Sequence, residues 1–312
     1  MQLRDLGEFG LIERVARAAR RQPGSGAVVL GIGDDAAVLR PAKGEDLVVT
    51  TDALVEDVHF RFGTQSHRCI GRRALVANLS DLAAMGARPL GFVLALAAPP
   101  SLEVRVVDGL MAGVLTEAKQ HRCPLVGGNL SRARQTALTI TALGSVPRGR
   151  QLLRSAARPG DRIWVTGALG AVALELARVA AGQGVIRRVP VPRLRAGRAL
   201  ARLAGIGACI DISDGLQEDL GHLLDSSGCS AEIDPAAVPL PPRFGAACRK
   251  LKLNPLELAT TGGEDYELLF TVRRTGPTGA QLRRRLGVAV TEIGRVVERR
   301  TPAGSGGGWR HF

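Results

Sequence analysis

The chain has 312 residues, 45% of them hydrophobic, which is enough apolar material for folded cores and excludes the disordered class. No apolar run reaches the roughly 18–20 residues of a membrane span, so we expect no contact with a membrane. The formal net charge is +13 but only 3% of residues are aromatic, so stacking platforms for single-stranded nucleic acid are lacking.

Lys43, Lys119, Lys250 and Lys252 are the only lysines among the 42 basic residues, and arginine supplies the rest. We expect most of these arginines to decorate solvated helices. A basic C-terminal half also suits substrates that carry phosphate, with nucleic acid as the weaker alternative. We therefore predict no nucleic-acid partner.

The length suits two domains, and the charged N-terminus does not have the pattern of a signal peptide. The cysteines are widely spaced and form no Cys-x-x-Cys pair; they are Cys69, Cys123, Cys209, Cys229 and Cys248. This spacing favours reduced, buried thiols and a cytoplasmic location over disulfides or zinc.

The first half alternates between apolar strands and helical periodicity. We predict strands at 27–32, 47–50, 90–97 and 137–146 and helices at 66–86 and 102–120. The turn-like, basic sequence 147–150 is the predicted boundary between domains 1–147 and 148–312.

In the second half, strands are predicted at 162–166, 208–212 and 266–272, and helices at 171–181, 194–204 and 216–226. A connector rich in proline and arginine occupies 187–195. Both halves share strands whose ends carry aspartates.

One motif superficially matches a dinucleotide-binding fingerprint: Gly31-x-Gly33-x-x-Ala36, with Asp52 about 20 residues further on. That fingerprint requires a crossover helix between two parallel strands. The short segment between Asp35 and Leu47 contains a proline and a glycine, and it has room for a hairpin but not for such a helix. The dinucleotide-binding interpretation is therefore rejected.

Five aspartates lie at junctions rich in glycine, serine or threonine: Asp34, Asp52, Asp81, Asp211 and Asp214. Because a carboxylate beside an apolar strand is costly to bury without a cation, and hard oxygen ligands suit Mg²⁺, the set predicts a magnesium site that holds nucleotide phosphates. Asn78 and Asp81 are three residues apart on the predicted helix, so both can face this site.

Each aspartate also has a purely structural interpretation. Asp214 with Gln217 fits a helix N-cap and its capping-box partner, and Asp34 fits a turn. Asp81 fits a solvated helix face. Five junctions of the same chemistry are harder to explain in this way than any one of them. The glycine pairs 127–128 and 262–263 allow backbone amides to approach phosphate, although glycines in turns are common.

Six segments carry a family resemblance: Gly-Ile-Gly-Asp-Asp-Ala-Ala (31–37), Thr-Thr-Asp-Ala-Leu-Val-Glu-Asp-Val-His-Phe (50–60), Ala-Asn-Leu-Ser-Asp-Leu-Ala-Ala-Met-Gly-Ala (77–87), Gly-Gly-Asn (127–129), Asp-Ile-Ser-Asp-Gly-Leu (211–216) and Gly-Gly-Glu-Asp-Tyr-Glu-Leu (262–268). In this order they closely resemble the thiamine-monophosphate kinase family, over almost the whole chain. Single motifs would indicate only the wider superfamily that includes aminoimidazole ribonucleotide synthetase and selenophosphate synthetase.

The resemblance implies an α/β (α+β) fold of two domains like aminoimidazole ribonucleotide synthetase, with mixed sheets flanked by helices. It also implies a homodimer in which the N-terminal sheets pair, and a nucleotide bound between the domains.

The resemblance assigns a role to each motif residue. Implied Mg²⁺ ligands are Asp34, Thr50, Thr51, Asp52, Asp81, Asp211 and Asp214. Implied ATP contacts are Gly128, Asn129, Arg154 and Ser213, and implied contacts to thiamine monophosphate are His59, Glu264 and Trp309. The implied catalytic residues are Asp52, Asp81, Asp211 and Arg154.

The implied reaction is Mg²⁺-assisted, in-line transfer of phosphate from ATP to thiamine monophosphate. Because the acceptor is an ionised phosphate oxygen, catalysis needs positioning and charge neutralisation more than a strong base. At Asn129 the family usually has aspartate, which puts one metal position in question. Two alternatives stay open: a superfamily enzyme with another acceptor, and an inactive nucleotide-binding homologue.

Overall fold

The computed structural model describes residues 1–32 and 36–299, which form two compact units. The first unit comprises Met1–Leu82, Arg88–Arg148 and Gly182–Val189, and the second comprises Ala83–Ala87, Gly149–Ala181 and the described chain from Pro190 onward. The boundary predicted from the sequence, between the functional domains 1–147 and 148–312, stays a prediction.

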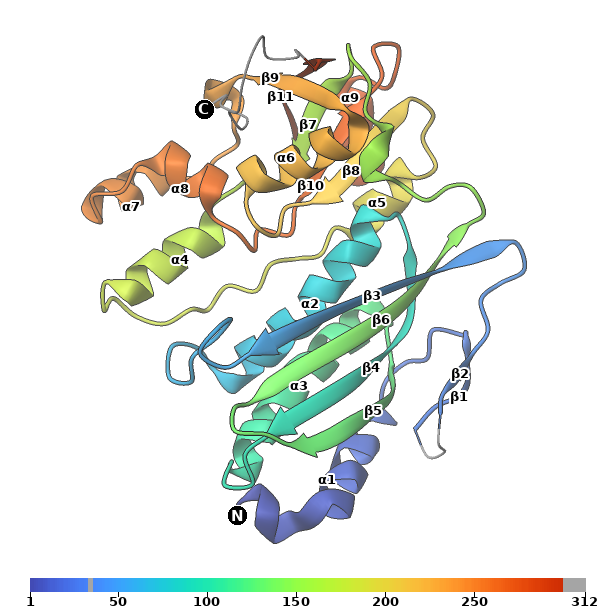
Figure 1. Ribbon diagram of the computed structural model, residues 1–312, viewed down its shortest axis with the longest axis vertical. Helices are drawn as coiled ribbons and strands as arrows, with labels where there is room; N and C mark the ends of the chain where they lie inside the picture. The colour runs from blue at the N-terminus through green and yellow to red at the C-terminus, as the bar shows by residue number, and fades with distance from the viewer. Residues whose placement is uncertain (33–35, 300–312) are drawn as a thin grey trace. The chain divides into compact units, whose positions relative to one another are not determined.

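The first unit contains a long four-stranded sheet, a two-stranded ribbon and helices (Figure 1). Its elements in chain order are α1 (Leu3–Ala19), β1 (Val28–Leu30), β2 (Val38–Leu39), β3 (Glu45–Val55), α2 (His67–Ala84, whose last two residues cluster with the second unit), β4 (Arg88–Ala98), α3 (Val104–His121), β5 (Leu125–Arg132) and β6 (Ala137–Pro147).

The second unit contains a five-stranded sheet and short helices. Its elements are η1 (Arg154–Ala156), β7 (Arg162–Thr166), α4 (Ala171–Ala180), α5 (Leu194–Leu200), β8 (Ile206–Asp211), α6 (Leu216–Ser227), β9 (Cys229–Ile233), η2 (Pro235–Ala237), α7 (Phe244–Lys250), α8 (Pro255–Thr261), β10 (Leu268–Val272), α9 (Gly279–Leu286) and β11 (Val290–Glu298).

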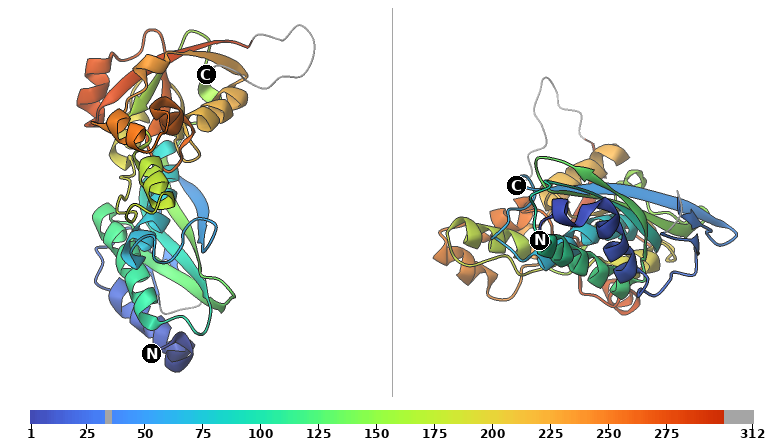
Figure 2. Two further views of the ribbon diagram at one scale, coloured as in Figure 1. Left: turned by 90° about the vertical axis from the view of Figure 1, so that its left-hand side faces the viewer. Right: turned by 90° about the horizontal axis from the view of Figure 1, so that it is seen from below.

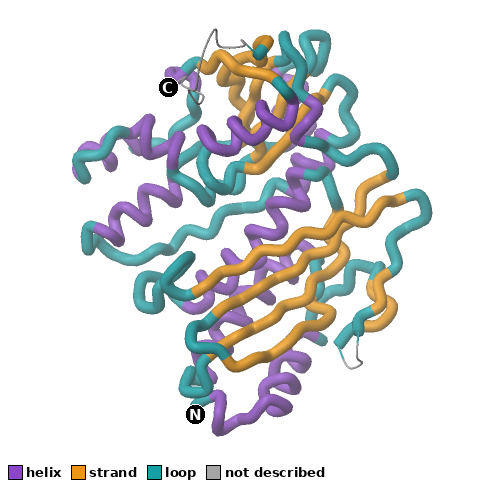
Figure 3. Tube along the Cα trace, viewed as in Figure 1, coloured by secondary structure: helices purple, strands orange, loops and turns teal. Residues whose placement is uncertain are grey.

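The sheet of the first unit has the strand order β3-β6-β4-β5, with β4 and β5 parallel and the other pairs antiparallel. Helices α2 and α3 cover one face of this sheet, and no helix among the described residues of the first unit lies over the face turned to the viewer in Figures 1 and 3; the left view of Figure 2 shows α2 and α3 on one side of the strands. We call these the helix face and the open face.

Side chains along β4 follow this division. Phe92, Leu94 and Leu96 are buried on the helix face, while Val93 and Ala95 alternate with them and are less buried. Successive residues of a strand point to opposite faces, so the register assigns each residue of the neighbouring strands to a face as well.

Glycines let α2 and α3 pack closely. A methyl group at Gly71 of α2 would overlap the carbonyl oxygen of Leu110, and one at Gly113 of α3 would overlap that of Arg68. Backbones that approach this closely leave no room for a side chain at either position. The two glycines therefore fix how α2 lies against α3 and the sheet.

The sheet of the second unit has the order β8-β10-β7-β11-β9 and is antiparallel throughout. Strand β10, which lies between β8 and β7, is buried along its whole length. Apolar side chains of β7, β8 and β10 form a core with α6, α7 and α8 on one side of the sheet, and α9 contacts β11 and α5.

The expected class, mixed sheets flanked by helices, is confirmed, but two boundaries are wrong. Thr51 and Asp52 lie within β3 rather than after it, and the glycine pair 127–128 lies within β5 rather than in a turn. No crossover helix follows β1 in the described residues, as expected, but β1 pairs with β2, which was not predicted, and not with β3, which pairs with β6 in the four-stranded sheet.

No helix in the described part of the chain is long and apolar enough to cross a membrane. The five cysteines are buried and unbonded to one another, as expected. Burial raises the pKa of Cys123 to about 12 and raises that of Cys209 as well.

We predict that Gly113→Ala destabilises the protein. Alanine favours helix by up to about 1 kcal/mol, but its methyl group forces α3 away from α2, and overpacking of this kind costs about 1–3 kcal/mol. Thermal unfolding should shift down by roughly 3–8 °C. Gly221→Ala on α6 is the control, since a methyl group there meets nothing within 4 Å. An unchanged or raised Tm in Gly113→Ala would contradict the packing described.

Candidate active site

In the first unit, β3 and α2 bring predicted metal ligands together. The Thr50 hydroxyl donates a hydrogen bond to Oδ2 of Asp81. Asp52 follows Thr50 by two residues in the same strand, so both side chains lie on the helix face. Thr50, Asp52 and Asp81 therefore belong to one group of oxygen donors.

Asn78 adds a buried oxygen to this region. Its side chain is fully buried, and its Nδ2 donates to the carbonyl oxygen of Ala74 at 3.2 Å. Its Oδ1 has no hydrogen-bond partner among the residues described. A buried acceptor without a donor is costly, and Asn78 lies one turn before Asp81 on α2. A cation or an ordered water there would satisfy this oxygen.

Thr51 and Asn129 lie on the open face instead. The Thr51 hydroxyl donates to Ile140 O and accepts from the Thr141 hydroxyl, each at 3.1 Å. Asn129 pairs with Ala95 in the parallel β4–β5 ladder, which assigns it to the same face. The side chains of Thr51 and Asn129 are therefore separated by the sheet from those of Thr50 and Asp52.

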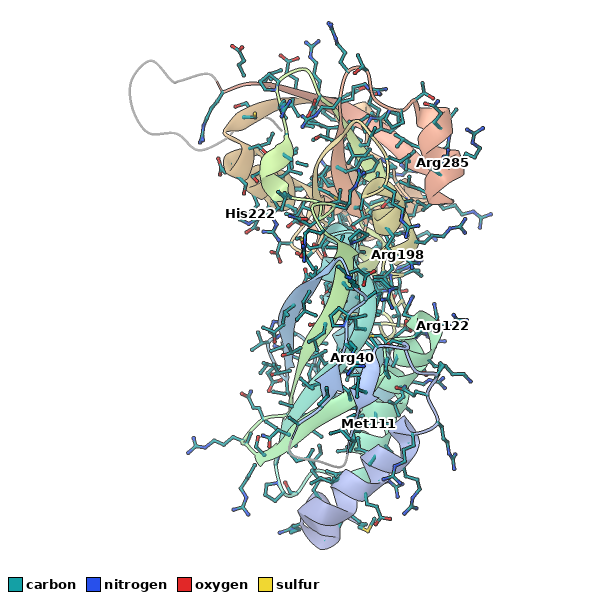
Figure 4. All side chains as sticks on the ribbon, turned by 90° about the vertical axis from the view of Figure 1, so that its right-hand side faces the viewer. Arg40, Met111, Arg122, Arg198, His222 and Arg285 are labelled. Atoms are coloured by element: carbon teal, nitrogen blue, oxygen red, sulfur yellow. The ribbon has the colours of Figure 1, made fainter. Side chains whose placement is uncertain are left out.

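A cavity of about 620 Å³ runs along the edge strand β5. Gly127, Gly128 and Asn129 line it together with apolar side chains of α1, β4 and α3, including Met111, which is labelled in Figure 4. Cavities of this size and apolar character commonly bind small molecules and cofactors. The two predicted ATP contacts of this unit, Gly128 and Asn129, both line it.

His59 lies in the exposed turn after β3. Its Nδ1 accepts a hydrogen bond from the backbone N–H of Val55 at 3.1 Å, and the backbone N–H of His59 donates to Val55 O at 2.8 Å. With Nδ1 occupied as an acceptor, the neutral ring carries its proton on Nε2. This nitrogen is the one available to donate to a ligand.

In the second unit, the segment after β8 runs beside the segment before β10. The backbone N–H of Tyr266 donates to Ile212 O at 2.8 Å, and that of Glu264 donates to Ser213 O at 2.7 Å. Register pairs Asp211 with Leu268. The predicted residues Asp211, Ser213, Asp214 and Glu264 are thereby brought to one end of the sheet.

The backbone of this pairing is unusual at two residues. Glu264 and Tyr266 have φ of 63° and 51°, a conformation that non-glycine residues seldom adopt. A methyl group at Gly263 would overlap Ser213 O, so the two segments approach as closely as glycine allows. Such conformations persist where the surroundings hold them, and they concentrate at functional sites.

Asp219 of α6 fixes the turn that follows β8. Its Oδ2 accepts hydrogen bonds from the backbone N–H groups of Ser213, Asp214 and Gly215 at 2.9, 3.0 and 3.2 Å. Burial raises the pKa of Asp219 to about 6, although these bonds act to lower it. The N-cap of α6 is Gly215, with no side-chain capping bond, so the alternative that Asp214 caps this helix is wrong.

Two further acidic residues anchor the Gly262–Leu268 segment. Asp265 Oδ2 accepts from the backbone N–H of Gly170 at 2.7 Å. Glu267 is buried, accepts from the Thr166 hydroxyl at 2.6 Å and forms a two-pronged ion pair with Arg193, whose Nε lies 2.6 Å from Oε2.

The remaining predicted residues are less constrained. Arg154 begins η1, which contacts β8 and α6, and its side chain is exposed. Asp34 and Trp309 lie outside the described residues.

The oxygen donors of the first unit fit Mg²⁺ by their chemistry: carboxylates, hydroxyls and the unpartnered Asn78 Oδ1. Within residues 1–32 and 36–299, no three His, Cys, Asp or Glu side chains form a metal-binding group by themselves. Mg²⁺ is usually held by one or two carboxylates together with phosphates and water, so this finding is compatible with a site completed by a nucleotide.

The sequence matches two family models in tandem. Residues 33–146 match the AIR synthase related protein, N-terminal domain, and residues 158–305 match the corresponding C-terminal domain. Thiamine-monophosphate kinase of Haemophilus influenzae is 36% identical over 306 residues, covering 94% of this chain and 90% of that relative. That of Aquifex aeolicus is 33% identical, and the match covers all of both chains. The chain belongs to the thiamine-monophosphate kinase family.

Solved structures of the thiamine-monophosphate kinase family share this fold. The enzyme from Stenotrophomonas maltophilia has a TM-score of 0.80 and 36% identity, covering 94% of this chain and 95% of that one. AaThiL complexed with AMPPCP and TMP has a TM-score of 0.74 and 32% identity, covering 96% and 93%. Hydrogenase maturation protein HypE in complex with ATP, at 22% identity and a TM-score of 0.77, shares the fold. The family resemblance and the two-domain fold are confirmed.

Asp219, Asp265 and Glu267 were missed at the sequence level. The last two lie inside the Gly262–Leu268 motif, where only Glu264 was singled out. Asp219 lies in the first turns of a helix, where an acidic residue is ordinarily explained by the helix dipole. Its distance of four to six residues from the amides it binds was the available signal.

We predict that Glu267→Gln destabilises this member of the kinase family by about 3 kcal/mol, because Arg193 loses its charged partner in a mostly buried position. Equilibrium urea unfolding measures the change. Glu232→Gln is the control: it removes an exposed partner of Arg295 in the same unit and should cost no more than about 1 kcal/mol. Equal effects of the two substitutions would contradict this assignment.

Proposed function

We propose that this chain catalyses the ATP-dependent phosphorylation of thiamine monophosphate to thiamine diphosphate, with Mg²⁺ bound by its aspartates. The chain is a kinase by family, and the acceptor of the reaction is a phosphate group. The relative AaThiL, solved with AMPPCP and TMP, supports ATP as the phosphate donor and thiamine monophosphate as the acceptor.

The observation that carries the proposal is the backbone pairing in the second unit. It brings Asp211, Ser213 and Asp214 beside Glu264 through the 2.7 Å bond from Glu264 N–H to Ser213 O. Residues proposed for metal and nucleotide thus adjoin a residue proposed for the acceptor. Phosphoryl transfer depends on this kind of positioning.

In the first unit, Asp52, Asp81 and the hydroxyl of Thr50 would hold Mg²⁺, and Asp34 is proposed to complete the set. Because the Thr51 side chain lies on the open face, Thr51 would join this set only through its backbone carbonyl oxygen. In the second unit, Asp211 and Asp214 take this role. When bound, Mg²⁺ neutralises phosphate charge and aligns the phosphates. The contact from Thr50 to Asp81 orients the carboxylate before any ligand arrives.

Gly128 and Asn129 are proposed to contact ATP from the cavity along β5. Ser213 would bind a phosphate oxygen through its hydroxyl, and the exposed guanidinium of Arg154 would stabilise charge on the transferred group. Asn129 retains an oxygen acceptor at the position where the family usually has aspartate, but it adds no negative charge.

His59 and Glu264 are proposed to contact thiamine monophosphate. The His59 Nε2–H suits a phosphate or hydroxyl acceptor. The thiazolium ring is a cation, which suits the carboxylate of Glu264 and an aromatic face, the role proposed for Trp309.

The direct test is incubation of the purified protein with ATP, Mg²⁺ and thiamine monophosphate, with thiamine diphosphate and ADP separated by chromatography. We expect equal amounts of the two products. ADP without thiamine diphosphate would indicate another acceptor, tested by replacing thiamine monophosphate with other phosphorylated amines. ATP binding without ADP would indicate an inactive homologue.

We predict that Asp52→Asn and Asp211→Asn each reduce kcat by roughly a hundredfold or more. Each substitution removes a negatively charged ligand of the Mg²⁺ that would neutralise phosphate charge in the transition state. Asp46→Asn is the control for Asp52, because Asp46 lies on the same strand but pairs at the surface with Arg148 at 3.5 Å. Circular dichroism should show all three variants folded. Retention of activity within a few-fold in Asp52→Asn would remove that residue from the metal site.

We further propose a homodimer formed through the open face. Leu47 and Val49 of β3 are 50% and 57% exposed there, and a long sheet face with exposed branched side chains suggests a partner surface.

The cytoplasmic location stays a prediction from the cysteine spacing.

We predict that Val49→Asp yields monomers, because burying a carboxylate in an apolar interface is unfavourable. Light scattering coupled to size-exclusion chromatography measures the mass. Leu176→Asp is the control, as Leu176 is an exposed apolar residue of α4. A dimeric Val49→Asp, or a monomeric unmodified protein, would argue against this interface.

A further inference from the structure

The carboxylate of Asp219 occupies a cradle of three consecutive backbone amides. Its side chain is 2% exposed, and Oδ2 alone accepts from Ser213, Asp214 and Gly215. His222, labelled in Figure 4, and Glu218 lie on the exposed side of the same helix, so Asp219 belongs to its buried side.

Successive amides that converge on one point form a concavity that binds anions, and such concavities at helix N-termini often bind phosphate. Here the anion is internal. Because Oδ2 already accepts all three N–H groups, a phosphate cannot use them unless Asp219 leaves. Ligands of this turn must therefore be bound by its side chains.

We propose that Asp219 is a positioning residue: its carboxylate holds the turn Ser213–Gly215 so that the side chains of Ser213 and Asp214, and of Asp211 just before them, face the bound phosphates and metal. The expected effect on catalysis rests on the proposed kinase function. The three hydrogen bonds from the turn to Asp219, which we call the clamp, do not depend on that proposal.

The turn is also packed against the neighbouring segment, since a methyl group at Gly215 would lie 2.9 Å from Thr261 O. Gly215 has φ of 113° and starts α6 without a side-chain cap. On the opposite side, the bond from Glu264 N–H to Ser213 O joins the turn to the Gly262–Tyr266 segment. Loss of the carboxylate leaves three N–H groups without their acceptor, and the turn must then reorganise or recruit water.

Hydrogen exchange tests the clamp without substrate. In the unmodified protein, the amides of residues 213–215 should exchange at least about tenfold more slowly than free peptide amides. Asp219→Asn keeps the shape and one oxygen acceptor but loses the charge, and exchange should accelerate about tenfold; Asp219→Ala should accelerate it further. Glu218→Gln, an exposed neighbour, is the control and should change nothing.

Kinetics test the consequence. Asp219→Asn should reduce kcat by about tenfold or more and raise the Mg²⁺ concentration for half-maximal rate, with KM for thiamine monophosphate within about twofold. A merely structural residue would lower Tm without moving the Mg²⁺ requirement of the folded fraction, so the assay is run well below the Tm of each variant.

The outcomes separate the two proposals. Accelerated exchange with no transfer by the unmodified protein refutes the proposed function and leaves the clamp standing. Transfer with unchanged kcat and Mg²⁺ requirement in Asp219→Asn overturns the positioning role. Rapid exchange at 213–215 in the unmodified protein overturns the clamp itself, even if the variants fail to fold.

Discussion

The interior position of β10, between β8 and β7, determines much of the second unit. This strand is buried along its length between β8 and β7, so the residues on either side of it must leave the sheet in fixed directions. The segment before β10 is thereby forced to run beside the segment after β8. The positive φ angles of Glu264 and Tyr266 and the close approach at Gly263 follow from this constraint. Their conformational cost is offset by the burial of the strand.

The motif order along the chain was sufficient to predict the family and the two-part fold, whereas the metal-binding role of the aspartates of β3, α2 and β8 stays a prediction. The motif order did not predict on which face of the first sheet each residue lies. That depends on strand register: Thr50 and Asp52 differ from Thr51 only by one position, yet they point the opposite way. The glycine pair 127–128 was expected in a turn because glycine favours turns, whereas close approach to Leu94 requires a residue without a side chain inside β5.

The ion pairs of the arginines were the other feature that the sequence did not predict. Arginines were expected mainly on solvated helices, and Arg198 and Arg285, labelled in Figure 4, belong to α5 and α9. Arg193 and Arg273, however, each pair with a buried carboxylate, Glu267 in one case and Asp161 in the other. Nothing local in the sequence distinguishes these arginines from their neighbours, because their partners lie 74 and 112 residues away. Long-range pairing of this kind appears only once the sheet is assembled.

The burial of all five cysteines has a practical consequence. A thiol reacts as the thiolate, and burial holds the pKa of the Cys123 and Cys209 thiols far above neutral pH. Maleimide or iodoacetamide reagents should therefore label the folded chain slowly. A single cysteine introduced at an exposed residue such as Val58 would be the reactive thiol, so fluorophores or spin labels can be attached without first replacing the native cysteines.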